Sequence, residues 1–139
     1  MMQIDYKCPD CGAIGILSFS ERIISDELRW SASHRCPECD YATELDDIGA
    51  LPNHLRNVVL QTEGKWQLKL ARQPSLAILK ALKVELNLSL EALKQLKENI
   101  DKYSIIGEGT KTEMVFLKHK LEHTVDEQDA LKVVRIFAS

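Results

Sequence analysis

The four cysteines of this 139-residue chain form two pairs, and their spacing constrains the fold of the N-terminal region more than any other feature. The pairs are Cys8 with Cys11 and Cys36 with Cys39. Two residues separate the cysteines of each pair, and 24 residues separate the pairs. Two intervening residues let the chain turn tightly, so both sulfurs of a pair can face the same ion. Four thiolates gathered in this way are the tetrahedral ligand set that a structural Zn²⁺ prefers.

The residues beside the cysteines favour tight turns. A proline follows the first cysteine of each pair and fixes the backbone dihedral φ for a turn. Gly12 follows the first pair and can adopt the positive φ that commonly comes after such a turn. Asp40 holds the equivalent place after the second pair, where glycine adopts positive φ more easily but aspartate is tolerated.

Strand-like stretches flank and separate the two pairs. They are residues 4–7, 13–19, 28–32 and 41–45. Over residues 3–46 this pattern resembles the zinc ribbon family, in which two cysteine turns on β-hairpins clamp one zinc ion. A single Cys-x-x-Cys pair would also suit a redox centre, whereas two pairs at this spacing favour a metal. Because cysteines fill all four ligand positions, we predict a closed, structural zinc site rather than a catalytic one.

Two other residues of this region have alternative interpretations. His34 lies two residues before Cys36 and could replace a cysteine as ligand, but its position also suits an ordinary strand side chain. Trp30 fits the core of the ribbon better than it fits a platform for stacking bases. A region of this size has little core of its own, so we expect folding to depend on the metal and a chelator to unfold residues 3–46.

The sequence lacks the features of secreted and membrane-spanning chains. No apolar run approaches the ~18 residues needed to span a bilayer. Residues 1–10 lack a charged segment followed by an apolar one, so no secretory signal is visible. We therefore expect a cytosolic protein, in which thiols stay reduced and cysteines hold metal rather than form disulfides.

Charge is divided unevenly along the chain. Residues 1–63 hold 5 basic and 11 acidic residues, a net charge of −6, whereas residues 64–139 hold 13 basic and 10 acidic residues, a net charge of +3. Nucleic-acid binding requires a basic surface, because phosphate contacts supply most of the affinity. The acidic N-terminal half therefore argues against a nucleic-acid partner, and the split suggests two units with different surfaces.

Residues 48–64 predict a short connecting helix. Pro52 suits the first turn of this helix, Leu55 and Val59 lie at helical spacing, and Gly64 can end it. We expect its apolar stripe to pack one module against the other.

The rest of the chain predicts elements in the order β-α-α-β-α-β. The expected strands are residues 66–70, 104–107 and 131–137, and the expected helices are residues 75–86, residues 90–99 and one that begins at Thr110. Leucines spaced by three and four residues predict the first two helices, and Ser89 is a good N-cap for the second. Thr110 and Glu113 form a capping box before the third helix.

Residues 66–137 resemble the C-terminal domain of the bacterial ribosomal stalk protein. The stretches that carry the resemblance are residues 75–83, 87–94, 108–111 and 117–122. In that family the first two helices of the domain recruit translation GTPases through a basic, partly apolar face. The resemblance implies the same role for the residues at matching positions. These are the basic Lys80, Lys83 and Lys94 and the apolar Leu79 and Leu90.

The chain also departs from the stalk pattern. Ser75 replaces a usual lysine, and Asn87 and Ser89 replace two glycines of the turn between the helices. Residues 124–129 form a longer, acidic loop, and a ribbon stands where the stalk protein has its dimerising domain and hinge. The other interpretation of the helix lysines, which include Lys97, is an ordinary solvated helix face.

One further pattern suggests catalysis. His119, Glu122 and His123 match the H-x-x-E-H signature of some zinc peptidases. The helix should end at the second histidine, however, where cationic side chains are favourable in any case. Such a peptidase also needs more ligand-bearing helices and a cleft, which a domain of this size can hardly supply. We expect His119 to bind no zinc.

The whole sequence predicts an α+β protein in three parts. They are a β zinc ribbon over residues 1–47, a connecting helix over residues 48–64 and the stalk-like β-α-α-β-α-β domain over residues 65–139. No catalytic set is visible, so we expect a protein-binding protein rather than an enzyme, with one structural Zn²⁺ as its cofactor.

Two hypotheses describe what such a protein binds. A small, acidic, metal-stapled module suits an inhibitor or immunity-type protein that neutralises a toxin or enzyme with a basic active site. The acidic residues that would contact this partner are Glu38, Asp40, Glu44, Asp46 and Asp47. The alternative is a translation-associated adaptor that binds a translation GTPase through its stalk-like helices.

Overall fold

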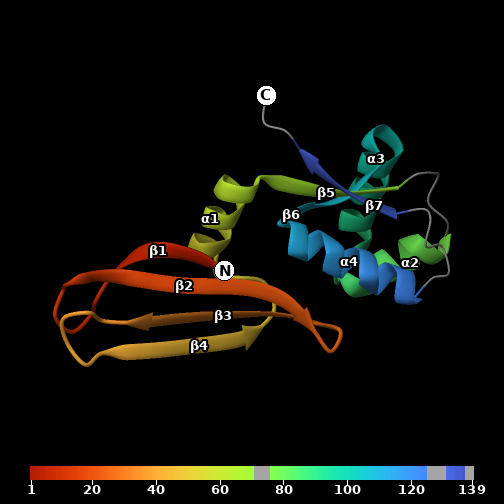
Figure 1. Cartoon of the computed structure of the whole chain (residues 1–139). Coiled ribbons are helices and arrows are strands. Elements are labelled where there is room, and N and C mark those ends of the chain that lie inside the picture. The colour runs from red at the N-terminus through yellow and green to blue at the C-terminus, as the bar shows by residue number, and fades with distance from the viewer. Residues whose placement is uncertain (71–75, 125–130, 137–139) are drawn as a thin grey trace. The chain divides into compact units, whose positions relative to one another are not determined.

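The computed structural model describes residues 1–70, 76–124 and 131–136, and it confirms the α+β class predicted from the sequence (Figure 1). The chain divides into two compact units, Met1–Val59 and Leu60–Ser139. The first unit contains an antiparallel sheet and the four cysteines, and the second contains a smaller sheet with helices. Within the described residues, no helix is both long enough and apolar enough to cross a membrane.

The sheet of the first unit has four strands in the order of the chain. The strands are β1 (Met2–Lys7), β2 (Ile14–Ile24), β3 (Glu27–Arg35) and β4 (Ala42–Ile48). All neighbours are antiparallel, so successive strands reverse direction. The β1–β2 and β3–β4 connections therefore lie at the same end of the sheet, and these are the segments that contain the cysteine pairs.

Strands β2 and β3 form a longer hairpin than the sequence predicts. Their pairing continues to Ile24 and Glu27, so only Ser25 and Asp26 make the turn. Both turn residues have positive φ, 50° and 63°, as in a type I′ turn. Glycine and asparagine usually mark such turns, and their absence explains why the sequence pattern ends these strands too early.

Helix α1 (Asn53–Glu63) completes the core of the first unit. Alternation along the strands places Leu17, Phe19 and Ala32 on one face of the sheet, where they cluster with Leu51, Leu55 and Val59. The helix forms where the sequence predicts it, and Gly64 follows it with φ 86° and donates its N–H to the Leu60 carbonyl. Its buried face thus packs on the ribbon sheet.

The second unit has the predicted order β-α-α-β-α-β. Its elements are β5 (Lys65–Leu70), α2 (Leu76–Glu85), α3 (Leu90–Tyr103), β6 (Ile105–Gly109), α4 (Lys111–Thr124) and β7 (Leu131–Ile136). Strand β5 lies in the centre of a three-stranded antiparallel sheet of order β6-β5-β7. Helix α3 is longer than predicted, because Ile100 continues its apolar stripe into the core.

Side chains cap the N-terminal ends of α3 and α4 in the second unit. Ser89 accepts the Ala92 N–H at 3.1 Å, as expected of an N-cap. The capping box is also confirmed, because Thr110 Oγ1 accepts the Glu113 N–H at 3.1 Å and Glu113 Oε1 accepts the Thr110 N–H at 3.0 Å. Asn87 has φ 50°, so asparagine supplies the left-handed conformation in the connection between α2 and α3.

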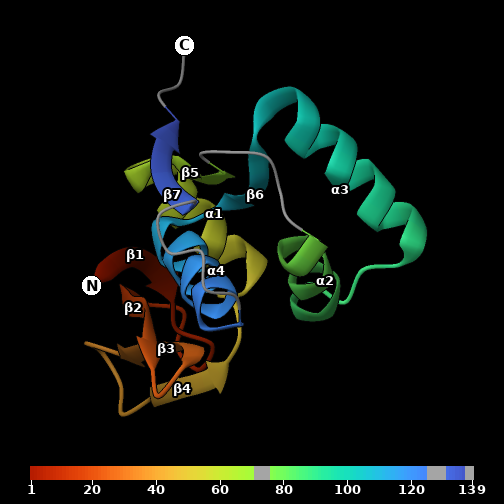
Figure 2. The same cartoon turned by 90° about the vertical axis from the view of Figure 1, so that its right-hand side faces the viewer.

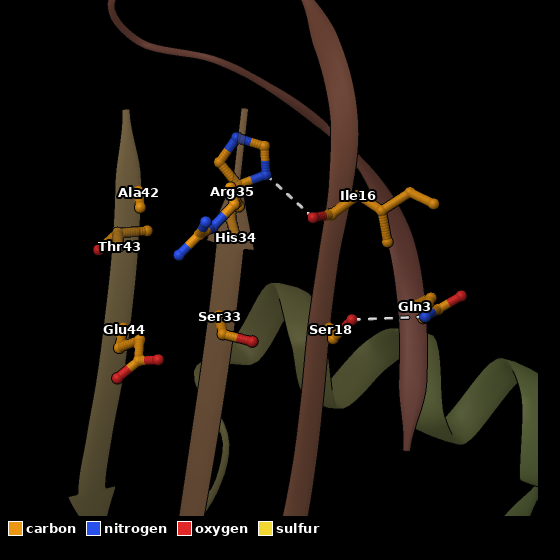
Figure 3. A pocket seen from close by; sticks show the side chains of 9 residues that line it. All are labelled: Gln3, Ile16, Ser18, Ser33, His34, Arg35, Ala42, Thr43 and Glu44. Carbon is orange, nitrogen blue, oxygen red and sulfur yellow. Dashed lines mark hydrogen bonds between the residues drawn. The ribbon is translucent and has the colours of Figure 1, made fainter. Parts of the chain in front are cut away.

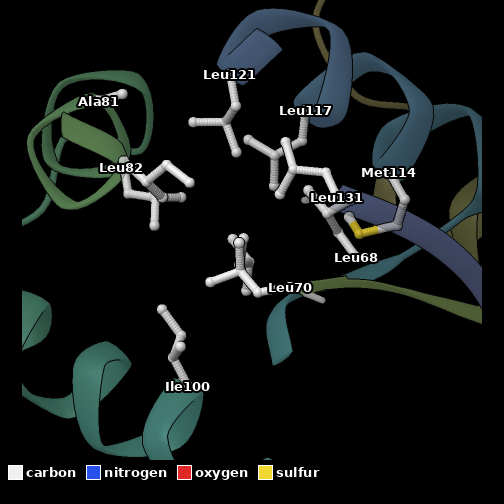
Figure 4. Packing of buried hydrophobic residues seen from close by; sticks show 11 residues of the cluster. Leu68, Leu70, Ala81, Leu82, Ile100, Met114, Leu117, Leu121 and Leu131 are labelled. Atoms are coloured by element: carbon white, nitrogen blue, oxygen red, sulfur yellow. The ribbon is translucent and has the colours of Figure 1, made fainter. Parts of the chain in front are cut away.

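Eleven buried residues form the core of the second unit. Figure 4 shows leucines from β5, α2, α4 and β7 pointing toward one another, with Ile100 of α3 below them. Figure 2 shows α2 and α3 as separate rods joined by a short connection. Some sequence features noted above, namely Ser75, residues 125–129 and Phe137, lie outside the described residues.

The core of the second unit provides a direct test of this packing. Leu82 is 0% exposed and Val84, on the same helix, is 76% exposed. We expect Leu82→Ala to lower the free energy of unfolding by about 2–5 kcal/mol, because it leaves a cavity. Val84→Ala should change it by less than about 0.5 kcal/mol. Urea unfolding followed by circular dichroism measures both variants, and equal effects would contradict the packing.

Candidate metal centre

The two cysteine pairs lie on turns of closely similar backbone geometry, here called the first knuckle (residues 8–13) and the second knuckle (residues 36–41). The Cys8 N–H donates to the Ala13 carbonyl at 2.8 Å, and the Cys36 N–H donates to the Tyr41 carbonyl at 2.8 Å. Each knuckle is thus closed by the same hydrogen bond across five residues. Each connects two paired strands, which hold both knuckles at one end of the sheet.

The knuckles differ at the residue after the second cysteine. Gly12 has φ 79° and donates its N–H to the Cys8 carbonyl at 2.9 Å, as the sequence predicts. Asp40 is not among the residues that adopt positive φ in the described part of the chain. The second knuckle therefore turns without the left-handed conformation that glycine supplies in the first.

The four sulfurs converge on one point. The Sγ atoms of Cys8 and Cys39 are 3.6 Å apart, and those of Cys11 and Cys36 are 3.5 Å apart. All four Sγ atoms lie within 4.8 Å of one another. Sulfurs placed 2.3 Å from a tetrahedral ion lie about 3.8 Å apart, so the cluster is positioned to hold one metal ion.

Backbone donors in the second knuckle face its sulfurs. The Glu38 N–H donates to Cys36 Sγ at 3.4 Å, and the Tyr41 N–H donates to Cys39 Sγ at 3.5 Å. Such hydrogen bonds favour the thiolate, which is the form that binds metal. Cys8 and Cys36 are buried, Cys39 is half-buried and Cys11 is exposed, so the centre opens to solvent on one side.

Crowding of the thiols separates their pKa values. Burial raises the pKa of Cys8, but hydrogen bonds from the backbone of Cys11 and Asp10 and from neighbouring thiols outweigh it and lower this pKa to about 6. The Tyr41 N–H lowers the pKa of Cys39, but burial and the other three thiols raise it to about 12. The pKa of Cys11 is also raised: the Ala13 backbone lowers it, and the Cys36 thiol and burial outweigh this.

His34 is not part of the sulfur cluster. The group of potential metal ligands in the described residues contains the four cysteines alone. His34 is buried, and its Nδ1 lies 2.9 Å from the Ile16 carbonyl oxygen, which can only accept a hydrogen bond. Trp30 packs against the core of the first unit, as the sequence predicts.

The sequence does not identify the aromatic residues around the knuckles. The His34 ring lies 4.6 Å from the Tyr6 ring and 6.1 Å from the Tyr41 ring, measured between centroids. Each of the three residues stands two positions from a cysteine, and this spacing is the signal that could have found them. Tyr6 and His34 lie in strands, where side chains alternate, so each shares a face with the cysteine two residues later, whereas Tyr41 lies in the second knuckle itself.

The H-x-x-E-H pattern does not form a second metal group in the described residues. His119 is exposed on α4, and Glu122 forms an ion pair with Lys118 at 3.6 Å. The side chain of His123 is outside the described part of the structure.

The acidic residues named from the sequence are all exposed. Glu38 and Asp40 lie on the second knuckle, and Glu44, Asp46 and Asp47 lie on β4. Beside β4, an open hollow of about 400 Å³ lies over the strands, and Figure 3 shows it with α1 behind them. Its polar lining consists of Gln3, Ser18, Ser33, His34, Arg35, Thr43 and Glu44.

Of the residues named by resemblance to the stalk domain, all but one are exposed. Lys80 and Lys83 on α2 and Lys94 on α3 are exposed, as is Leu90 at the start of α3. Leu79 is instead half-buried and packs against the core of the second unit. The lysines and Leu90 are therefore available to a partner, whereas Leu79 serves mainly the interior.

Comparisons with protein-family models, with curated proteins and with solved structures found no match. The likeness of the second unit to the stalk domain therefore rests on its sequence pattern and stays a prediction.

Metal binding at this centre should depend steeply on pH. All four thiols must lose their protons to bind a metal, and the raised pKa values of Cys11 and Cys39 mean that these two are protonated at pH 7. Release of at least two protons makes affinity fall roughly a hundredfold for each pH unit lost near neutrality. Competition with a chromophoric chelator at pH 6, 7 and 8 measures this, and a constant affinity would contradict the centre.

Proposed function

We propose that this protein is a non-catalytic inhibitor or immunity-type protein, whose zinc-stapled first unit presents an acidic surface to a basic toxin or enzyme. The observation that carries the proposal is the position of the acidic residues. They lie on the second knuckle and on the strand that follows it, so the metal centre would hold them in place.

Zinc is the metal that we assign to the centre. Four thiolates at tetrahedral spacing suit zinc or iron, and zinc is the usual ion of closed structural sites that need no redox chemistry. Cysteine fills every ligand position, so a bound ion keeps no open position for substrate. A structural role for the ion follows, with the first unit folding around it.

Strand β4 has the properties of a protein-binding edge. It pairs with β3 in unbroken register from Arg35–Ala42 to Arg29–Ile48, and among the described strands it has no neighbour on its other side. Proteins protect such edges with charged side chains, proline or a bulge; β4 has no proline and no bulge, and its protection consists of the carboxylates of Glu44, Asp46 and Asp47. Leu45 and Ile48 are 55% and 58% exposed, which adds apolar area to the edge.

The charge of β4 indicates what kind of partner fits it. Glu44 and Asp46 lie on one face of the strand, and Asp47 lies on the other. Like charges oppose pairing of this strand with a second copy of the chain, whereas basic residues opposite Glu44 and Asp46 favour pairing. An acidic surface also speeds association with a basic active site.

A second candidate function is favoured by the lysines of the second unit. Lys80 and Lys83 on α2 and Lys94 on α3 are exposed together with Leu90, as a basic and partly apolar docking face would require. This supports the translation-associated adaptor, which would bind a translation GTPase. The half-buried position of Leu79 removes one apolar contact from that face.

Charge reversal on each unit separates the two functions. We expect a basic partner captured from native lysate by the unmodified chain to bind Glu44→Lys/Asp46→Lys at least about tenfold more weakly, because like charges would then face each other. Lys80→Glu/Lys83→Glu should bind it unchanged. Affinity is measured with the purified partner at two salt concentrations, and inhibition of the partner's own activity is measured beside it.

Asp5→Lys on β1 is the matched control, because it reverses an exposed charge on the opposite edge strand of the same sheet. Equal zinc content shows that the first unit of each variant is folded, and an unchanged circular dichroism spectrum shows that the helices of the second unit are folded. If the captured partner is a translation GTPase and only Lys80→Glu/Lys83→Glu loses binding, the result would contradict the inhibitor function and support the adaptor function.

A further inference from the structure

His34 is the most deeply buried polar side chain beside the metal centre, and neither proposed function uses it. It is 3% exposed, and its Nε2 has no hydrogen-bond partner in the described part of the chain. Its Nδ1 is 2.9 Å from the Ile16 carbonyl oxygen. Burial of an imidazole nitrogen without a hydrogen-bond partner costs free energy. The hydrogen bond of Nδ1 and the packing of the ring must therefore offset this cost.

The side-chain hydrogen bond of His34 joins β3 to β2 at the end of the sheet that carries the knuckles. His34 is on β3, two residues before the second knuckle, and Ile16 is on β2, just after the first knuckle. The pairing of β2 with β3 stops at Leu17 and His34, so in the described part of the chain no pair of these strands lies nearer to the knuckles. The side-chain bond thus extends the connection between the strands beyond the end of their ladder (Figure 3).

Ring packing adds contacts from His34 to β1 and to the second knuckle. Tyr6 on β1 precedes the first knuckle, and Tyr41 closes the second, and both rings lie beside the His34 ring. Gly15 makes room for this arrangement. A Cβ atom at Gly15 would lie 2.8 Å from His34 Cε1 and 3.1 Å from Pro37 Cδ, so only glycine lets β2 approach the second knuckle this closely.

We propose that His34 is a positioning residue that holds the two knuckles at metal-binding distance without binding the metal. The Nδ1 hydrogen bond fixes β3 to β2, and the ring fixes β1 and the end of the second knuckle. Residues that orient metal ligands from outside the ligand set commonly change metal affinity by 10–100-fold when they are replaced. The inference rests on the metal-binding role proposed above.

The unpaired Nε2 makes the inference specific to one nitrogen. Asparagine at this position places an N–H donor where Nδ1 stands, but it gives up Nε2 and the ring contacts with Tyr6 and Tyr41. Glutamine places its donor one bond farther out, near the Nε2 position. His34→Asn should therefore keep the bond to Ile16, and His34→Gln and His34→Ala should lose it.

The test is the affinity of the full chain for Co²⁺, followed by displacement with Zn²⁺, read from the absorption of the cobalt–thiolate bonds. We expect His34→Ala and His34→Gln to raise the dissociation constant at least about tenfold. His34→Asn should lose clearly less affinity than either, because it keeps the bond to Ile16 and loses only the ring contacts, and its cobalt spectrum should be unchanged. Phe19→Leu serves as the control, because Phe19 is buried in the core of the same unit but outside the ring cluster.

Four results would overturn the inference. They are unchanged affinity in His34→Ala, equal losses in His34→Asn and His34→Gln, an altered cobalt spectrum in His34→Asn, and an equal loss in Phe19→Leu at a matched fall in melting temperature. If His34→Ala does not fold, the comparison of His34→Asn with His34→Gln still decides. If the unmodified chain binds neither metal, the proposed metal centre itself is wrong, which is a different result from any of these.

Discussion

The convergence of four sulfurs at one end of a sheet is the constraint on which the first unit depends. An antiparallel sheet with strands in chain order puts alternate connections at the same end, and each of these two connections carries a cysteine pair. Without an ion, ionisation of all four neighbouring thiols is unfavourable, as the raised pKa of Cys39 beside the other three thiols indicates. A bound cation would attract all four thiolates and so stabilise the cluster.

The two units are stabilised by different means. The second has a core of eleven buried residues drawn from its helices and its sheet, and it contains no cysteine. The first has six buried residues in its apolar cluster, half of them supplied by α1 and the residue Leu51 before it. We infer that the metal offsets this smaller core, and that the acidic edge strand β4 is held firmly because it begins directly after the second knuckle.

Much of the fold could be predicted from local patterns, and the failures have physical causes. Cysteine spacing predicted the cluster, because the tight turn of each pair is local, and the Ser89 and Thr110 caps were equally visible. The Ser25–Asp26 turn was missed because it contains neither glycine nor asparagine and because serine rarely adopts positive φ. The bond from His34 to Ile16 joins residues far apart in sequence, so it depends on strand register and cannot be seen in a spacing pattern.

Hydrogen–deuterium exchange of the full chain, measured by mass spectrometry before and after zinc removal, shows whether the first unit folds around its metal. We predict one zinc per chain, protection of residues 3–46 while it is bound and loss of that protection when a chelator removes it. Helices α2, α3 and α4 should keep their protection throughout. A chain that contains no zinc and still protects residues 3–46 would contradict the account.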